Sequence, residues 1–154
     1  MNIRKLNPSD LPATGRILQD TALFPADMLE AMTKPFFEDT DHPDLWFVGE
    51  IDDDGVVGFA YVRPEPLTDR TWNLLAIGIR SSHQGKGYGS RMLTEIERAL
   101  ATERILIVDT SGLDEYARTR AFYAQCGYHQ EAVIRDYWAT GDDKVTFRKP
   151  LGDR

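Results

Sequence analysis

The chain has 154 residues, of which 42 % are hydrophobic and 28 % are charged, and its formal net charge at pH 7 is -7. This length fits one domain with a single sizeable core and is short for two. No apolar stretch approaches the roughly 20 residues of a membrane-spanning helix, so no membrane partner is expected. The acidic balance argues against duplex nucleic acid as a partner.

The chain contains a single cysteine, Cys126, so an internal disulfide framework and a thiolate zinc cluster are both excluded. Its three histidines are scattered at positions 42, 83 and 129, and we therefore expect no metal site. The first residues hold no apolar segment of the signal-peptide kind. A cytoplasmic location is the default expectation.

The charge is divided unevenly along the chain. Residues 1–77 carry 6 basic and 14 acidic side chains, whereas residues 78–154 carry 12 basic and 11 acidic ones. The acidic residues gather mainly in residues 38–44 and 50–54. Such runs are typical of solvated loops, and they are also compatible with a surface that attracts cations.

The first part of the chain predicts a short strand and two helices. The strand is expected at residues 3–6, and the first helix begins near Ser9 or Asp10. A second helix begins near residue 25, because apolar residues recur at helical spacing up to Phe36. Pro35 is expected to break or kink this second helix.

Strand patterns follow the two helices. Two apolar runs flank Asp52-Asp53-Asp54-Gly55, which is a strong hairpin signal. The long apolar run at residues 71–79 predicts a central strand, in which Gly78 marks a bulge or a close backbone approach. The remaining predicted elements are a helix with its apolar stripe at 92–100, a buried parallel strand at 105–108, a helix at 116–126, and a closing hairpin of 132–138 and 145–148.

The most informative segment is the glycine-rich turn at residues 83–90, which lies between a predicted strand and a predicted helix. Free backbone N–H groups at a helix N-terminus bind phosphate oxygens. A P-loop is excluded because Lys86 is followed by Gly87 rather than by Ser or Thr. A dinucleotide fingerprint fits poorly, since the third glycine, Gly89, comes one position early.

The segment Gln84-Gly85-Lys86-Gly87-Tyr88-Gly89 resembles the pyrophosphate loop of the GNAT superfamily of N-acetyltransferases, Gln/Arg-x-x-Gly-x-Gly/Ala. The segment from Ala121 to Tyr128 resembles the family's helix that ends in a Tyr followed by Gly-Phe/Tyr. The order of elements matches over nearly the whole chain. The resemblance implies one α/β (α+β) domain over residues 1–150 and a tail at 151–154. Its sheet would be central, mixed and mostly antiparallel, splayed at the coenzyme A site and flanked by about four helices.

The resemblance also implies an activity. Acetyl-CoA would be the acyl donor, no metal would be needed, and the acetyl group would pass directly to a primary amine of a small-molecule or peptide acceptor. The early helices and the closing hairpin that would select this acceptor carry no readable motif. The excess acid of residues 1–77 suggests a cationic acceptor. A non-catalytic acyl-CoA-binding sensor is the alternative function, and a homodimer stays open.

Two residues are implied to be catalytic. Tyr123 aligns with the family's general acid, which protonates the departing thiolate. Asn73 stands where some relatives have a Glu, and an amide there can at most orient a water. Glu30 and Asp109 are further candidates for the base. The residues implied to bind the cofactor are Ile77, Gly78 and Ile79 along the pantetheine arm, Gln84, Gly85, Lys86, Gly87, Tyr88, Gly89 and Ser90 at the pyrophosphate, and Thr119 and Arg120.

The sequence departs from the family pattern at Tyr116, where many relatives place an Asn that touches the cofactor; Thr119 and Arg120 are candidates to replace it. Cys126 is interpreted as a structural residue, because no Cys-His-acid arrangement accompanies it. Phe36, Phe37 and Trp138 are candidates to line the acceptor pocket.

Overall fold

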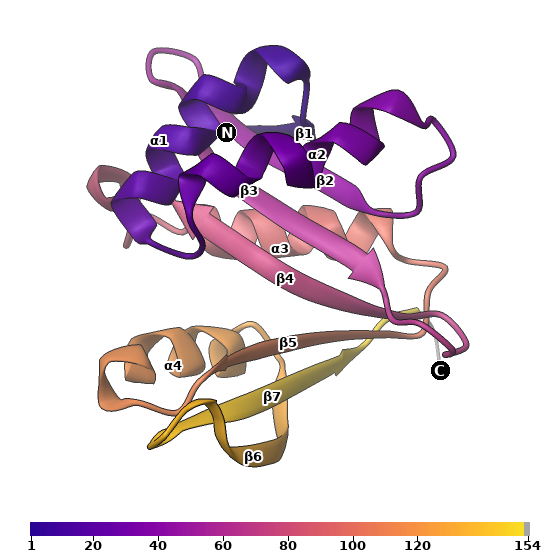
Figure 1. Ribbon diagram of the computed structural model, residues 1–154, viewed down its shortest axis with the longest axis vertical. Coiled ribbons are helices and arrows are strands. Elements are labelled where there is room, and N and C mark those ends of the chain that lie inside the picture. The colour runs from indigo at the N-terminus through magenta and orange to yellow at the C-terminus, as the bar shows by residue number, and fades with distance from the viewer. Residues whose placement is uncertain (153–154) are drawn as a thin grey trace.

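The computed structural model describes residues 1–152, which form one domain around a seven-stranded sheet (Figure 1). The strand order is β1-β2-β3-β4-β5-β7-β6, and only the β4–β5 pair is parallel. The strands are β1 (Asn2–Lys5), β2 (Leu45–Ile51), β3 (Gly55–Pro64), β4 (Thr71–Ile79), β5 (Ile105–Ser111), β6 (His129–Ala139) and β7 (Asp142–Pro150). The helices are α1 (Leu11–Thr21), α2 (Leu29–Glu38), α3 (Tyr88–Ala99) and α4 (Ala117–Gln125), with 3₁₀ turns at Pro8–Asp10, Ala26–Met28, Ser81–His83 and Asp114–Tyr116.

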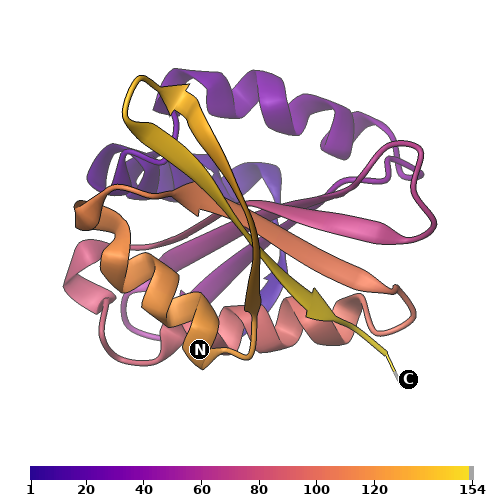
Figure 2. The same cartoon turned by 90° about the horizontal axis from the view of Figure 1, so that it is seen from below.

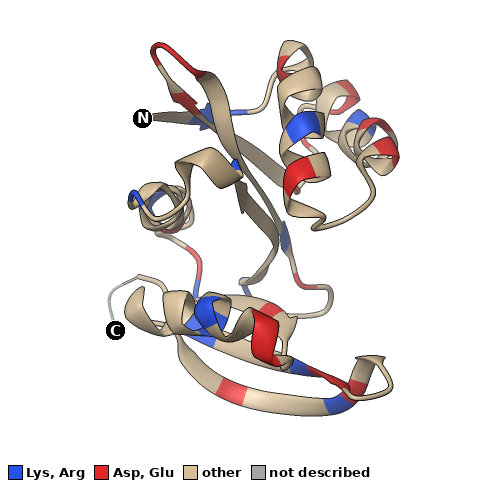
Figure 3. Ribbon diagram, turned by 90° about the vertical axis from the view of Figure 1, so that its left-hand side faces the viewer, with Lys and Arg blue, Asp and Glu red and all other residues tan. Residues whose placement is uncertain are grey.

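The helices divide between the two faces of the sheet. Figures 2 and 3 show α1 and α2 on one side and α3 and α4 on the other. Two buried clusters follow from this arrangement. Ile17 and Leu18 of α1 pack with Trp46 and Phe59, whereas α3 contributes to a second cluster under the opposite face. The mixed, mostly antiparallel sheet with four helices confirms the predicted fold class.

The predicted hairpin between β2 and β3 is confirmed. Ile51 pairs with Gly55, and Gly55 has a φ of +68°, a backbone conformation that glycine adopts without a steric penalty. The strands hold an aromatic stack between Trp46 and Tyr61, whose ring centroids lie 4.1 Å apart.

Pro35 was expected to break or kink the second helix, and the break is wrong, because α2 continues to Glu38. Proline removes the hydrogen bond that the carbonyl of Ala31 would accept, but Ala31 and Pro35 are both exposed, so water can replace it. The helix remains anchored by its buried side: Leu29 and Thr33 are buried, and the Thr33 hydroxyl donates to the carbonyl of Leu29 at 2.8 Å.

The predicted tail is docked at its first residue. The backbone N–H of Leu151 donates to the carbonyl of Arg104 at 2.9 Å, and its side chain packs against the core under α3 and α4. Residues 153–154 of this predicted tail lie outside the described residues. In the described part of the chain, every helix is too short or too polar to cross a membrane.

The N-terminal strand is fixed to the start of α1 by a buried ion pair, which generates a prediction. Arg4 binds both carboxylate oxygens of Asp10, at 2.7 and 2.9 Å, and the Asp10 side chain is only 7 % exposed. The hydrogen bond from Arg4 holds the pKa of Asp10 below its usual value. The carboxylate therefore stabilises the fold above pH about 3.9, and this contribution is lost as pH falls through the lower pKa of the folded state.

We expect Asp10→Asn to reduce the free energy of unfolding by about 1–3 kcal/mol at pH 7. The difference from the unsubstituted protein should shrink progressively as pH falls below about 4, because the carboxyl of the unfolded chain takes up a proton first and that of the folded protein follows at its lower pKa. Urea unfolding at pH 7 and pH 3 measures both effects. The exposed Asp53→Asn is the control, and an equal loss in that variant would contradict the assignment.

Candidate active site

The sheet opens between its two central strands. β4 and β5 pair only from Thr71 to Leu74 on β4 and from Ile105 to Val108 on β5. Beyond these residues β4 continues to Ile79, while β5 stays paired with β7 alone, and the two strands diverge (Figure 1). Separated strands leave backbone N–H and C=O groups without a ladder partner. The gap is therefore a place where an extended molecule can form backbone hydrogen bonds.

An extra residue marks the point of separation. Tyr61 pairs with Ala76 and Val62 pairs with Leu74, so Leu75 is the additional residue of a β-bulge in β4. The sequence analysis offered a bulge or a close approach at Gly78, and the bulge lies instead at Leu75. Side chains pack closely against Gly78, because an added Cβ there would lie 2.8 Å from the Phe59 ring and 3.0 Å from Leu23. A close backbone approach at Gly78 stays a prediction.

The pairing with β3 decides which backbone groups of β4 face the gap. The N–H of Arg80 donates to the carbonyl of Val57, which makes that residue pair a hydrogen-bonded one. Hydrogen-bonded and non-hydrogen-bonded pairs alternate in an antiparallel ladder, so Gly78 bonds to β3, while Ile77 and Ile79 direct their backbone groups away from it. The side chain of Gln84 already donates to the carbonyl of Ile79 at 2.9 Å. Ile77 is left as the central backbone contact for a ligand.

The glycine turn lies at the end of β4 and leads into α3. Gly85 and Gly87 have φ values of +74° and +82°, and Gly87 is the N-cap of α3. The N–H of Gln84 donates to the carbonyl of Ser81, so the free amides begin after Gln84. The first residues of a helix have no intrahelical acceptor for their N–H groups. The exposed turn thus directs a row of donors and the positive end of α3 toward solvent.

Gly89 and Ser90 also have structural roles. An added Cβ at Gly89 would lie 3.1 Å from the Phe122 ring of α4, so this glycine allows α3 and α4 to approach each other. The Ser90 hydroxyl donates to the carbonyl of Gly87 at 2.9 Å and supports the start of α3. Lys86 and Tyr88 complete the turn, and the Lys86 side chain is exposed.

Two carboxylates that the motifs did not indicate hold Ser81, just before this turn, and His83, its first residue. Asp20 of α1 accepts hydrogen bonds from the N–H and hydroxyl of Ser81, at 2.5 and 2.8 Å. Asp54, in the β2–β3 turn, lies 2.9 Å from Nε2 of His83. These hydrogen bonds lower the pKa of both carboxyl groups. The acidic run at residues 50–54 therefore lies beside the glycine turn.

Tyr123 lies on α4, in the core cluster that α3 and α4 cover. Its ring contacts Phe122, Tyr128 and Phe147, and the residue is 4 % exposed. Its hydroxyl has no hydrogen-bond partner within residues 1–152, yet it is not among the fully buried unpartnered atoms, so the oxygen keeps some contact with solvent. Burial, with a smaller contribution from Cys126, raises the pKa of Tyr123. The phenol is protonated throughout the neutral range.

Cys126 is a half-buried residue behind Tyr123. It packs against the core, and burial raises the pKa of its thiol, with Glu97 contributing in the same direction. A thiol that stays protonated is a poor nucleophile. The structural interpretation of Cys126 agrees with this environment.

Asn73 lies on the part of β4 that is still paired with β5, directly opposite Ile107. Its Nδ2 donates to Oε1 of Glu65 at 2.7 Å, while its Oδ1 is buried without a partner. Leu74 faces the core with α3, so alternation places Asn73 on the opposite face. An unpartnered buried amide oxygen is a site that a ligand N–H or a water can satisfy.

The two other candidate bases differ in their surroundings. Asp109 accepts a hydrogen bond of 2.6 Å from the Thr146 hydroxyl and lies 3.8 Å from Nζ of Lys144, so its charge is paired. Glu30 is exposed in the first turn of α2.

Arg120 of α4 holds the loop between β5 and α4. Nη1 of Arg120 donates to the carbonyls of Ser111 and Leu113, at 2.7 and 2.8 Å, and thereby fixes the end of β5. Thr119 lies one residue before it on α4, and Tyr116 is 39 % exposed at the end of the preceding 3₁₀ turn. A phosphate contact by Arg120 stays a prediction.

The candidate acceptor-pocket residues do not form one group. Phe36 and Phe37 contact each other with ring centroids 5.5 Å apart, and both pack against the core with α1. Trp138 lies on β6 and donates from Nε1 to the carbonyl of Thr110 at 3.4 Å.

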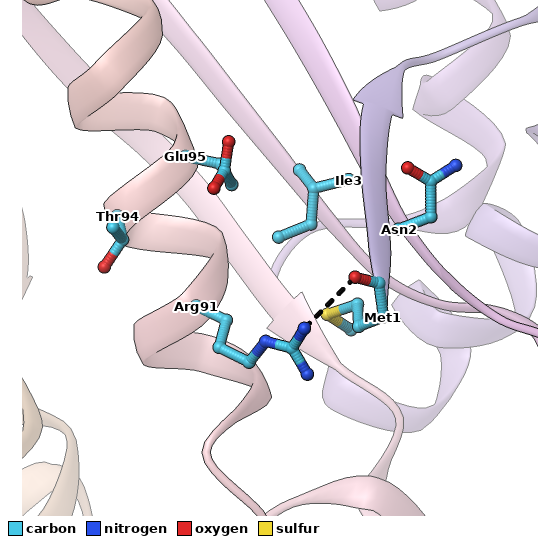
Figure 4. A pocket seen from close by; sticks show the side chains of 6 residues that line it. All are labelled: Met1, Asn2, Ile3, Arg91, Thr94 and Glu95. Carbon is cyan, nitrogen blue, oxygen red and sulfur yellow. Dashed lines mark hydrogen bonds between the residues drawn. The ribbon is translucent and has the colours of Figure 1, made fainter.

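A hollow of about 320 Å³ lies elsewhere, between β1 and α3 (Figure 4). Nη2 of Arg91 donates across it to the carbonyl of Met1 at 3.3 Å. Its lining comes from the chain start and β1, at the sheet edge opposite β6, and from α3, and it shares no residue with the gap between β4 and β5. We therefore place the candidate site at the gap.

Known proteins resemble this chain in sequence and in fold. The model of the acetyltransferase (GNAT) family matches residues 12–128. No curated protein matches the chain by sequence. Among solved structures, a GNAT-family acetyltransferase described as putative, from Desulfovibrio desulfuricans, is 28 % identical with a TM-score of 0.86, covering 97 % of this chain and 98 % of that one.

Two further structures share the fold at lower identity. The ribosomal-protein-S18-alanine N-acetyltransferase of Escherichia coli is 21 % identical with a TM-score of 0.77, over 99 % of this chain and 95 % of that one. An aminoglycoside 6′-N-acetyltransferase complexed with coenzyme A is 19 % identical with a TM-score of 0.79, over 100 % and 99 %.

The packing at Gly78 generates a prediction. Gly78→Ala forces the Phe59 ring and the Leu23 side chain to move, and we expect it to reduce the free energy of unfolding by about 1–3 kcal/mol. Gly15→Ala is the matched control, because no atom lies within 4 Å of its added Cβ and alanine favours the helix. Thermal unfolding of both variants measures the difference; equal stability would show that β4 tolerates a side chain there.

Proposed function

The chain belongs to the GNAT acetyltransferase family, and from this membership we propose that it transfers an acetyl group from acetyl-CoA directly to a primary amine. The observation that carries the proposal is the gap between β4 and β5, with the donor-rich glycine turn at its end. The two features suit the two parts of the donor: an extended amide-containing arm and an anionic pyrophosphate. We further propose that residues 1–150 act as the single acetyltransferase domain.

The chain offers a continuous set of groups for this donor. The pantetheine arm would lie along Ile77, Gly78 and Ile79 and pair with the backbone of Ile77, since Gly78 bonds to β3 and the carbonyl of Ile79 accepts from Gln84. Amides from Gly85 onward would hold the pyrophosphate, together with the Ser90 hydroxyl and the N-terminus of α3. The Lys86 side chain, Thr119 and the remaining guanidinium N–H groups of Arg120 are proposed to contact phosphates.

In the reaction the amine nitrogen forms a bond to the acetyl carbon, the carbon–sulfur bond breaks, and the sulfur receives a proton. Tyr123 is proposed as the donor of this proton, because its phenol is protonated and its oxygen has no other partner in the described residues. It regains a proton from solvent. A backbone N–H of β4 near the Leu75 bulge is proposed to stabilise the oxyanion.

Asn73 is proposed to orient a water or the acceptor nitrogen. Glu65 binds Nδ2 of Asn73, which fixes the amide with its oxygen as the free acceptor. That oxygen can accept an N–H from the nitrogen that becomes positive as the new bond forms. The amine is proposed to lose its proton to solvent, because the charge of Asp109 is already paired.

The acceptor is proposed to be a small molecule or a peptide end with a primary amine, which is cationic in solution. Solved relatives named for ribosomal-protein alanine and for aminoglycosides support the amine class. The acidic run near Asp54 lies beside the glycine turn, so only residues 38–44 remain as the acidic run that can attract a cation toward the acceptor side.

We expect Tyr123→Phe to lower kcat by about 10²–10⁴-fold, with the KM for acetyl-CoA within about twofold. Burial raises the pKa of Tyr123, so its ionisation should not reduce kcat of the unsubstituted protein below pH about 10. Initial rates of CoA release between pH 6 and 10 test both points. Tyr128→Phe is the control, because its hydroxyl is bonded to Glu97; full activity in Tyr123→Phe would remove the general-acid role.

The turn makes a separate prediction. Gly87→Ala strains a backbone with φ of +82°, and we expect the Kd for acetyl-CoA to rise about tenfold, corresponding to about 1.4 kcal/mol. Calorimetric titration of Gly87→Ala and of Gly15→Ala, which lies outside the turn, measures the effect. Unchanged affinity in Gly87→Ala would contradict the turn as the pyrophosphate site.

One experiment distinguishes the alternative function, a non-catalytic acyl-CoA-binding sensor, from acetyl transfer. If the protein binds acetyl-CoA tightly but no amine in a broad panel accelerates the release of CoA, the chain is an acyl-CoA sensor and not a transferase. Amine-dependent CoA release with formation of the acetylated amine supports the enzyme.

A further inference from the structure

The sheet has a face that no helix covers. Val108, Val145 and Phe147 point into the core with α3 and α4, so alternation directs Asp109, Lys144 and Thr146 to the other side. There α1 and α2 lie over the first strands and do not reach β7 and β6 (Figures 1 and 3). We call this region the open face, and it consists of Asp109, Ile134, Tyr137, Lys144, Thr146 and Arg148.

The charges of the open face are already paired within the protein. Asp109 is held by Thr146 and Lys144, and Arg148 lies 3.8 Å from Glu131. At the end of the hairpin, the Ser111 hydroxyl donates to Asp142 at 2.5 Å. On the open face itself, Asp109 and Arg148 each have a partner of opposite charge, whereas Asp136, Asp142 and Asp143 at the end of the hairpin accept hydrogen bonds from neutral groups and keep their negative charge.

Apolar and aromatic side chains remain exposed at the same place. Ile134 is 47 % exposed, Tyr137 51 % and Trp138 48 %, and the two aromatic rings meet edge to face at 4.7 Å. Nζ of Lys144 lies 4.1 Å from the centroid of the Tyr137 ring. The protein's own cation therefore takes one face of that ring, and what Tyr137 offers a ligand is chiefly apolar contact.

The open face continues into the proposed reaction site. Asp109 follows Val108, which is the last residue of β5 paired with β4. Trp138 reaches back to the carbonyl of Thr110, the next residue of β5. The aromatic pair thus begins within two residues of the point where the strands separate. A molecule whose amine lies at that point would extend its neighbouring atoms over Tyr137 and Ile134.

We propose that the open face binds an aromatic or branched aliphatic group attached to the acceptor amine. The acceptor is a monoamine with an apolar neighbour; polyamines and aminosugars are disfavoured because they offer no aromatic or branched aliphatic group to Ile134 and Tyr137. This inference rests on the proposed acetyl transfer, since it names the substrate class of the same site. Apolar burial next to the reacting nitrogen discriminates by about tenfold or more between amines of similar size.

The first experiment compares amines directly. Release of CoA from acetyl-CoA is measured with phenethylamine, Phe-Gly-Gly amide, spermidine and kanamycin. We expect kcat/KM at least tenfold higher for the two aromatic amines than for the two polycations. A higher value for phenethylamine indicates a small-molecule acceptor, and a higher value for the peptide indicates a chain N-terminus. Preference for spermidine or kanamycin overturns the inference and leaves acetyl transfer intact.

Neighbouring residues of β6 provide matched variants. Ile134 pairs with Lys144 on the open face, whereas Val133 pairs with Val145, whose side chain faces α4. Their exposed fractions are almost equal, 47 % and 48 %. We expect Ile134→Ala and Tyr137→Ala to raise the KM for phenethylamine about fivefold to tenfold, and Val133→Ala to change it less than twofold. Equal effects at positions 133 and 134 would overturn the inference.

A binding measurement separates this inference from the proposed function. Phenethylamine is titrated by calorimetry into the protein saturated with CoA, where no transfer can occur. If phenethylamine binds and Tyr137→Ala weakens that binding, the open face is a binding site for the apolar group. This holds even if no amine is acetylated, and in that case only the proposed acetyl transfer is contradicted. If polyamines are acetylated and phenethylamine does not bind, the inference about the open face is contradicted, while the proposed acetyl transfer stands.

Discussion

The rest of the site depends on the separation of β4 from β5 after Leu74 and Val108. A strand in the middle of a sheet must satisfy the N–H and C=O groups on both of its edges. Beyond the Leu75 bulge, the backbone groups of β4 have strand partners on the β3 side only. The groups on its other edge can bond to the Gln84 side chain, to solvent or to a ligand. The chain then turns at Gly87 into α3, whose N-terminus supplies further unpaired donors at the end of the same gap. One break in the ladder thus aligns backbone donors for an extended molecule and for its anionic end.

The sequence was sufficient where local pattern decides the structure. The apolar run of β4, the helical stripe of α3 and the glycines of the turn all depend on neighbours within a few residues, and each was predicted at its place. Of the two alternatives at Gly78, a bulge or a close backbone approach, the bulge lies elsewhere, at Leu75. A bulge is a property of two paired strands, and the shift of register opposite Tyr61 leaves no mark in β4 alone. Pro35 was misjudged for a related reason: whether proline ends a helix depends on what the rest of that helix packs against, and Thr33 and Leu29 keep α2 in place.

The residues that hold the candidate site in position could not be predicted from the sequence, for a different reason. Asp20 and Ser81 are 61 positions apart, and Asp54 and His83 are 29 apart. Asp20 belongs to no motif, and Asp54 belongs to one that predicts only the hairpin; neither local sequence indicates a contact with the segment before the glycines. The pair of Glu65 and Asn73 is closer in sequence, but it forms only because the loop after β3 folds back beside β4. Local sequence patterns therefore predict the residues that would contact a ligand. They predict less well the residues that hold these contact residues in position.

The same contacts change what the uneven charge means. Two of the acidic residues of the first half, Asp20 and Asp54, lie next to the turn proposed to hold an anion, which their formal charge alone would disfavour. Both are bonded to groups of the segment before the glycines of that turn, and Asp20 occupies the N–H of Ser81. Because Gln84 also gives its N–H to Ser81, the donors still free for an anion start at Gly85, at the end of the turn nearest α3. The carboxylates therefore act by fixing the backbone, and they confine the anion to the place where the helix N-terminus opposes their charge. On the other side of the gap the charges of the open face cancel in pairs, so the selectivity proposed there follows from exposed apolar surface and not from the net charge of -7.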